Sequence, residues 1–117
     1  MNMESKEMAK VIIGAMEEKK AEDIRVLDIS EVSSLGDYFI IASGNNVNQV
    51  QAIIDEVDMK LGRQGVEPRQ IEGYSNANWV LMDYGDVIVH VFDKENRLFY
   101  DLERIWKDGK SVDPASI

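Results

Sequence analysis

The sequence predicts a single α/β domain in which helices flank a mixed β-sheet. The chain has 117 residues, of which 44% are hydrophobic and 30% are charged, and this composition is typical of one globular domain. Two long segments carry apolar residues at helical spacing, and shorter β-rich segments lie between and after them. Because both a helical crossover and a hairpin connect these strands, we expect parallel and antiparallel pairs in one sheet.

The N-terminal part is predicted to form a helix followed by two strands. Residues 4–20 place apolar side chains at helical spacing, namely Met8, Val11, Ile12, Ala15 and Met16. Residues 24–29 alternate between polar and apolar side chains, which indicates a strand. Residues 38–42 form a compact apolar run bounded by Asp37 and Ser43, which is typical of a buried central strand.

A second helix is predicted to begin after Asn46. Asn46 suits an N-cap, and Gln49 stands three residues later, as in a capping box. The side chains expected on the apolar face of this helix are Val50, Ile53, Ile54, Val57 and Leu61. Gly65 and Pro68 are expected to end the helix.

The next segments are rich in β-forming residues. Residues 70–72 are expected to form a short edge strand, followed by a polar turn over residues 73–78. Residues 79–84 and 87–92 are separated by Gly85-Asp86, which predicts an antiparallel hairpin.

The C-terminal part is predicted to form a helix followed by a loosely ordered tail. Asp93 can cap a final helix with an apolar face made of Leu98, Phe99, Leu102, Ile105 and Trp106. Gly, Ser, Asp and Pro are frequent after this face. We therefore expect a domain over residues 1–108 and a loosely ordered tail over residues 109–117.

The charge balance restricts the kind of partner. The chain has 13 Lys and Arg against 22 Asp and Glu, so its formal net charge is −9. Nucleic-acid binding depends on phosphate neutralisation by Lys and Arg, so an acidic chain is poorly suited to it, and to anionic membranes as well. A basic partner is favoured.

Residue usage excludes several chemistries. The chain has no cysteine, which excludes disulfides, zinc fingers and a cysteine nucleophile. His90 is the only histidine, so no site can use two imidazoles. No apolar run approaches the length of a membrane span, and charged residues interrupt the start where a signal peptide would need an apolar stretch. We expect a soluble cytoplasmic protein.

The candidate catalytic groups have simpler interpretations. Asp83, Asp86 and Asp93 lie around a tight turn, where aspartate commonly serves the turn itself rather than a metal ion. Residues 43–46 precede a helix but lack a phosphate-binding lysine or spaced glycines, so they indicate a capped helix start. His90 has no nucleophile motif around it, which favours a structural histidine or a protein contact. No catalytic residue, metal or cofactor is expected.

The aromatic residues of the second half suggest a contact surface. Strand alternation would place Trp79, Leu81 and Asp83 on one face, and Val80, Met82 and Tyr84 on the other. If a helix covers only one face, an exposed Trp and Leu would form an anchor for another protein. Alternatively, Trp79 fills the core or a seam between two copies of the chain. The pattern alone leaves both interpretations open.

Three stretches of the sequence resemble the ribosomal silencing factor (Iojap-like) family. The first is Asp37 to Gly44 with Gln49 to Ile53, the second is Glu72-Gly73 with Trp79 to Phe92, and the third is Arg97 to Trp106. The resemblance covers about residues 5 to 108, in order and with natural spacing. Family members often carry a basic residue immediately before the Gln-Val pair, but this chain has Asn48 there.

The resemblance implies a translational repressor without enzymatic activity. Members of the family bind the large ribosomal subunit through ribosomal protein L-fourteen and block its joining with the small subunit when nutrients are scarce. The resemblance also implies a nucleotidyltransferase-like topology without the catalytic motif. The chain agrees, because it contains no Asp-x-Asp pair and approaches the Gly-Ser loop only at Gly36-Asp37.

The resemblance further implies which residues contact the partner: Tyr74, Trp79, Leu81, Met82, Asp83, His90, Arg97, Tyr100 and Asp101. Trp79, Leu81 and Met82 would form an apolar anchor. Asp83 and Asp101 would pair with basic groups of the partner, whereas Arg97 could instead pair internally with Asp83 or Glu72. Two alternatives from other classes are a magnesium-dependent nucleotidyltransferase-like enzyme and a homodimeric structural module that buries the Trp79 surface.

Overall fold

The computed structural model describes residues 4–31, 36–94 and 110–114, and all structural statements concern these residues. In chain order, the elements are α1 (Ser5–Glu18), β1 (Glu22–Asp28), β2 (Tyr38–Gly44), α2 (Val47–Arg63), β3 (Gln70–Glu72), β4 (Trp79–Asp83), β5 (Val87–Asp93) and β6 (Lys110–Val112). None of the helices in these ranges is both long enough and apolar enough to cross a membrane.

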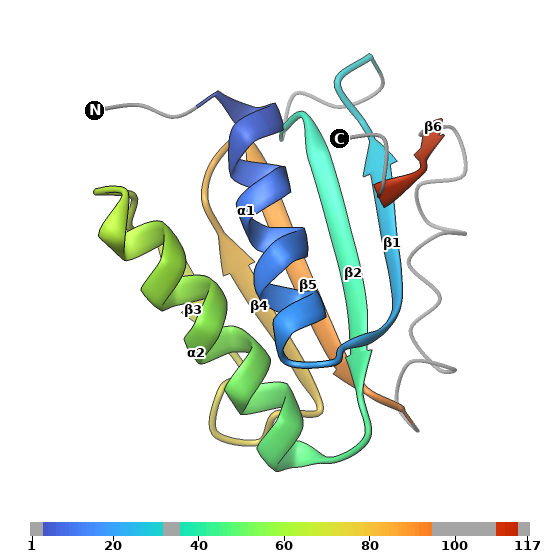
Figure 1. Ribbon diagram of the computed structural model, residues 1–117, viewed down its shortest axis with the longest axis vertical. Helices are drawn as coiled ribbons and strands as arrows, with labels where there is room; N and C mark the ends of the chain where they lie inside the picture. The colour runs from blue at the N-terminus through green and yellow to red at the C-terminus, as the bar shows by residue number, and fades with distance from the viewer. Residues whose placement is uncertain (1–3, 32–35, 95–109, 115–117) are drawn as a thin grey trace.

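The six strands form one mixed sheet in the order β3-β4-β5-β2-β1-β6 (Figure 1). β2 and β5 are parallel neighbours at its centre, and every other neighbouring pair is antiparallel. The predicted α/β class, mixed sheet and central strand at residues 38–42 are therefore confirmed. So is the hairpin, in which β4 pairs with β5.

Two details differ from the prediction. β1 begins at Glu22 rather than residue 24, and its register with β2 shifts between Glu22 and Arg25, so simple alternation misplaces its start. The sequence does not predict β6, because this strand has only three residues, Lys110 to Val112, and lies in the expected loosely ordered tail. They pair with the end of β1, Val26↔Val112 and Asp28↔Lys110, through backbone hydrogen bonds that composition does not reveal. The predicted final helix falls within residues 95–109, outside the described residues.

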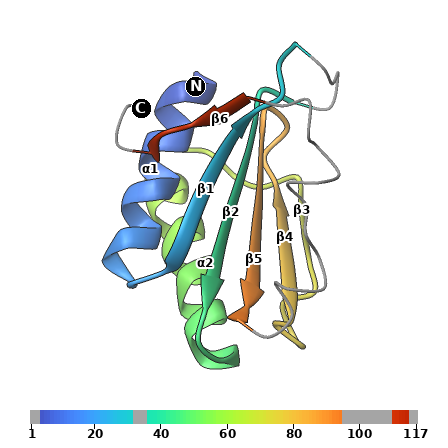
Figure 2. The same cartoon turned by 90° about the vertical axis from the view of Figure 1, so that its right-hand side faces the viewer.

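Both helices lie on the same face of the sheet (Figure 2). The main core fills the space between them and the sheet, and it includes Ile12 and Met16 of α1 and Ile53, Ile54 and Leu61 of α2. The apolar faces predicted for the two helices therefore make this core. The opposite face of the sheet carries a second buried cluster, made of Leu27, Ile29, Phe39, Ile41 and Phe92, against which Trp79 and Ile88 pack.

Gln49 joins the end of α1 to the start of α2. Its backbone N–H donates to the N-cap side chain, Asn46 Oδ1, at 2.8 Å. Its own Oε1 accepts from the backbone N–H of Asn45, the residue before the N-cap, at 2.6 Å, so the capping box expected from the sequence is displaced by one residue. Its Nε2 also donates to the carbonyl oxygens of Lys19 at 3.2 Å and Lys20 at 3.0 Å. One side chain thus satisfies backbone groups at two helix termini.

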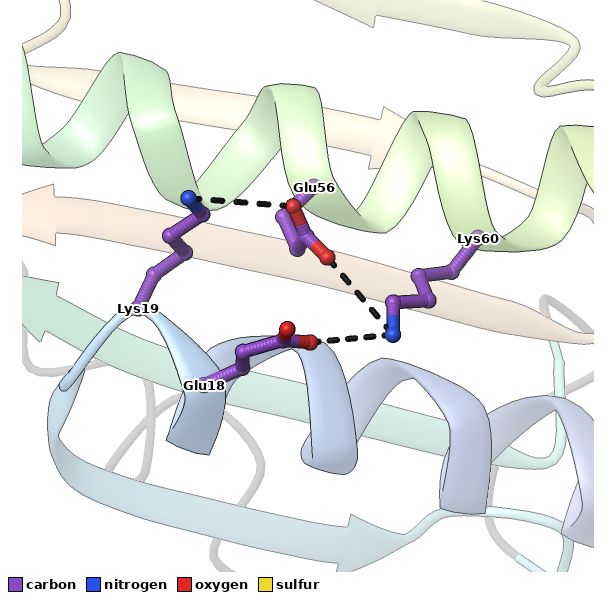
Figure 3. A network of polar contacts seen from close by, with 4 residues as sticks. All are labelled: Glu18, Lys19, Glu56 and Lys60. Carbon is purple, nitrogen blue, oxygen red and sulfur yellow. Dashed lines mark ion pairs between the residues drawn. The ribbon is translucent and has the colours of Figure 1, made fainter.

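An ion-pair network also links the two helices (Figure 3). Lys60 Nζ of α2 lies 2.9 Å from Glu18 of α1 and 3.7 Å from Glu56, one turn earlier in its own helix. Lys19 reaches the other oxygen of Glu56 at 3.9 Å. The hydrogen bond between Lys60 and Glu18 raises the pKa of Lys60 and lowers that of Glu18. Glu56 is buried and lies between two lysines, which offsets its desolvation.

His90 lies inside the second cluster and is only 3% exposed. Its Nδ1 accepts a hydrogen bond from Trp79 Nε1 at 2.9 Å, and the Phe39 ring packs edge-on against the imidazole with centroids 4.5 Å apart. Burial lowers the pKa of His90 to about 4, so the imidazole is neutral at neutral pH. The structural interpretation of this histidine is confirmed.

Gln49→Glu should destabilise the protein, because it places a carboxylate oxygen against the Lys19 and Lys20 carbonyl groups while it retains the acceptor for Asn45. We expect the free energy of unfolding to fall by about 1–3 kcal/mol in urea titrations followed by circular dichroism. Asn48→Asp adds the same charge at the neighbouring exposed position near the start of α2, where the helix dipole favours it, and should not destabilise. Equal stability of the two variants would contradict this role of Gln49.

Acid should destabilise the protein through His90. The pKa is about 6.5 in an unfolded chain and about 4 in the folded protein, so between these values only the unfolded state takes up the proton. The free energy of unfolding should therefore be highest above pH 6.5 with respect to this group, and should fall by up to about 3 kcal/mol as the pH approaches 4. His90→Asn removes the titrating group. As the pH is lowered from 6.5 to 4, the free energy of unfolding of this variant should therefore increase relative to that of the unaltered protein. A constant difference between the two proteins from pH 7 to pH 4 would refute the assignment.

Candidate functional site

The candidate contact surface lies on β4. Trp79, Leu81 and Asp83 are half-buried and face away from the helices, whereas Val80 and Met82 point into the main core. The alternation predicted from the sequence is therefore confirmed. Strand β3 extends this surface, because in the antiparallel register Glu72 pairs with Leu81 and so shares its face.

We define the β3–β4 surface by Gln70, Glu72, Trp79, Leu81 and Asp83. It contains a depression of about 190 Å³ lined by Glu72, Gly73, Trp79 and Leu81. Gly73 has a positive φ of 80°, and a Cβ there would lie 2.2 Å from the carbonyl oxygen of Trp79. Only glycine can accommodate this close approach between the β3 end and the β4 start. The resulting surface combines an apolar floor with carboxylates beside it.

Met82 does not belong to this surface, which corrects its prediction as part of the anchor. Its side chain is completely buried in the core under the helices and pairs with Val89 of β5. The physical reason is the two-residue period of a strand, which puts Met82 on the face opposite to Trp79 and Leu81.

His90 supports the surface rather than forming part of it. It is buried beside Trp79, whose indole also stacks on Phe92 with ring centroids 5.4 Å apart and an interplanar angle of 21°. Direct contact between His90 and a partner, which the family resemblance implied, does not fit this burial. The Trp79 indole therefore makes two contacts with β5, a hydrogen bond to His90 and a ring stack on Phe92.

Asp83 has the turn role that the sequence favoured. Its Oδ1 accepts a hydrogen bond from the backbone N–H of Gly85 at 2.7 Å and so stabilises the hairpin between β4 and β5. Its backbone carbonyl accepts from the N–H of Arg69. Within the described ranges, no group of three or more His, Asp or Glu side chains is placed to hold a metal ion.

Tyr74 lies apart from the β3–β4 surface. Its hydroxyl donates to Asp55 of α2 at 2.9 Å, and this hydrogen bond raises the pKa of the phenol. Gln51 of α2 donates to the Tyr74 carbonyl at 3.0 Å. Tyr74 is 37% exposed and therefore accessible, but the loop that carries it is tied to the helix layer. Sequence reasoning missed Asp55 and Gln51, since no local pattern links α2 to this loop.

The remaining predicted contacts, Arg97, Tyr100 and Asp101, lie outside the described residues. Among the described candidates, the structure brings together Trp79, Leu81 and Asp83, and adds Glu72 from the neighbouring strand. The acidic and apolar character of this group suits a protein contact rather than a reaction centre.

Comparisons with known proteins identify the family of the chain. A family model described as "Ribosomal silencing factor during starvation" matches residues 2–117. The chain is 42% identical over 111 residues to the ribosomal silencing factor RsfS of Bacillus subtilis, covering 95% of this chain and 94% of that protein. It is 41% identical over 111 residues to RsfS of Halalkalibacterium halodurans, covering 95% of each.

Solved structures of similar sequence have the same fold. A crystal structure from Bacillus halodurans superposes with a TM-score of 0.84 at 40% identity, covering 93% of this chain and 99% of that one. Protein CV0518 from Chromobacterium violaceum gives a TM-score of 0.87 at 40% identity, with 95% and 92% coverage. The match of the family model to nearly the whole chain, together with these relatives, shows that the chain belongs to the ribosomal silencing factor family.

Proposed function

We propose that this protein represses translation by binding the large ribosomal subunit through ribosomal protein L-fourteen and sterically blocking its association with the small subunit. The observation that carries the proposal is the match of residues 2–117 to the family described as a silencing factor during starvation. That description also supports action under nutrient limitation. Since ribosomes are the target, we place the protein in the cytoplasm.

Related names support a large-subunit partner. A mouse relative, 25% identical over 99 residues, is named "Mitochondrial assembly of ribosomal large subunit protein 1". A maize relative, 30% identical over 99 residues, is named "Protein Iojap, chloroplastic". The chain covers 43% of each of these two longer proteins. The name of the mouse relative refers to the large ribosomal subunit, and we extend that association to this chain as part of the proposal.

The β3–β4 surface supports docking on a protein rather than on RNA. Trp79 and Leu81 supply the large apolar side chains that dominate binding energy at the centre of an interface. Glu72 and Asp83 lie on the same face, and the chain has a net charge of −9, which favours a basic ribosomal protein over phosphate. Asp101 would add a further carboxylate, and Arg97 either contacts the partner or pairs internally.

Steric exclusion requires no catalytic group. The family names indicate a regulatory factor rather than an enzyme. The nucleotidyltransferase-like alternative predicts a different property, because such an enzyme would bind a nucleotide together with Mg²⁺. Isothermal titration with both would show heat only if the enzymatic alternative holds.

Trp79→Ala should weaken binding to large subunits roughly 30-fold or more, because it removes the central aromatic side chain of the anchor. The measurement is subunit joining followed by light scattering, with the protein titrated against purified large subunits before small subunits are added. Met59→Ala is the matched control, since Met59 is a 42% exposed apolar residue on α2, on the helix side of the sheet. If a folded Trp79→Ala protein blocks joining at the same concentration as the unaltered protein, the anchor has been misplaced.

Glu72→Lys should slow association with large subunits several-fold at low salt, because it reverses a charge beside the anchor. The difference should shrink at high salt, where screening weakens the attraction. Rapid-mixing kinetics at two salt concentrations measure the effect. Glu7→Lys, an identical charge change at an exposed position of α1, should behave like the unaltered protein. Equal slowing by both variants would mean that only net charge matters.

A homodimer of the free protein would compete for the same surface. Sedimentation of the protein at low and high concentration, with and without Leu81→Glu, tests this alternative. Loss of a dimer in the variant would mean that the β3–β4 surface forms the dimer interface. The dimer would then have to dissociate before a protomer binds a ribosomal subunit. An unchanged sedimentation coefficient would leave the surface available in the free protein.

A further inference from the structure

Trp79 and His90 occupy diagonal positions on neighbouring strands. Trp79 pairs directly with Phe92, and His90 pairs directly with Leu81, so all four side chains share the face that points away from the helices. The indole and imidazole centroids are 5.9 Å apart, with an interplanar angle of 33°. This geometry lets Trp79 Nε1 donate to His90 Nδ1 at 2.9 Å.

The imidazole is a fixed acceptor. The Phe39 ring contacts it edge-on, and the Phe92 ring lies nearly parallel to it with centroids 6.4 Å apart and an angle of 12°. To accept at Nδ1, the neutral ring must carry its proton on Nε2. Burial favours the neutral ring.

Packing alone does not explain a histidine at this position. His90 Nε2 is buried and has no hydrogen-bond partner within the described part of the chain. A leucine or phenylalanine would fill similar space without an unsatisfied polar atom, and such atoms are unfavourable in a protein interior. What the imidazole provides, and an apolar side chain cannot, is the acceptor for the Trp79 indole.

We propose that His90 is a positioning residue for partner binding, whose Nδ1 holds the Trp79 indole in the orientation that lines the β3–β4 depression. The inference rests on the proposed role of Trp79 as the anchor. The stack on Phe92 alone permits the indole to slide or flip within its plane, whereas the hydrogen bond selects one orientation. An anchor that is ordered before binding loses less conformational entropy on association.

Two substitutions separate the acceptor from the packing. His90→Leu removes the acceptor, and His90→Asn restores an oxygen at nearly the position of Nδ1, since both atoms are bonded to Cγ. We expect His90→Leu to weaken affinity for large subunits roughly tenfold and His90→Asn to restore it to within about threefold. Val89→Ala is the control for lost stability, because Val89 lies on the same strand but points into the main core. It should leave affinity unchanged.

A spectroscopic readout tests the hydrogen bond in the free protein. The Trp79 indole N–H resonance, assigned through Trp79→Phe, should exchange slowly with solvent in the unaltered protein and in His90→Asn, and quickly in His90→Leu. If His90→Leu does not fold, the exchange rate of the Trp79 indole N–H in the unaltered protein is the test of the hydrogen bond. Rapid exchange there would overturn the proposal. In the Trp79→Phe background, which lacks the donor, His90→Leu should no longer lower the affinity for large subunits.

The outcomes distinguish this inference from the proposed function. If the unaltered protein does not bind large subunits, the proposed function fails, and the positioning role fails with it. If the unaltered protein binds and Trp79→Ala does not, but folded His90→Leu binds normally, only the positioning role is overturned. Equal weakening by His90→Leu and His90→Asn would also overturn it, because the restored acceptor would then have no effect.

Discussion

The parallel pairing of β2 with β5 at the centre of the sheet is the constraint on which the rest of the fold depends. Parallel neighbours cannot be joined by a tight turn, so the chain between them must cross over the sheet, and α2 makes most of that crossing. Before it returns to the centre, the chain adds β3 and β4 on the far side of β5. The crossover therefore creates both the helix-covered core and the β3–β4 surface at the sheet edge.

Polar side chains fix how the two helices sit on that core. Gln49 satisfies backbone groups at the end of α1 and the start of α2, and the pair between Lys60 and Glu18 joins the helices farther along. The Tyr74 loop is in turn tied to α2 through Asp55. The helix layer thus braces the loop that leads into β4, although the candidate contacts Trp79 and Leu81 lie on the opposite side of the sheet.

The two faces of the sheet differ in composition. The face under the helices is an apolar core, to which Val80 and Met82 contribute. The other face carries an aromatic cluster in which Trp79 donates a part-buried hydrogen bond to His90. A polar contact in such surroundings is directional, and it converts a packed aromatic side chain into an oriented one.

The sequence by itself determined the α/β class, both described helices, the central strand and the hairpin, because hydrophobic periodicity and capping residues such as Asn46 act locally. It also determined that Trp79 and Leu81 share a face, since strand alternation has a fixed period. The same period separates Met82 from Trp79 and Leu81. Only the tertiary structure decided that β6 pairs with β1 and that His90 lies within hydrogen-bond distance of Trp79. Each of these depends on which strands become neighbours, and that choice follows from contacts between residues far apart in the chain.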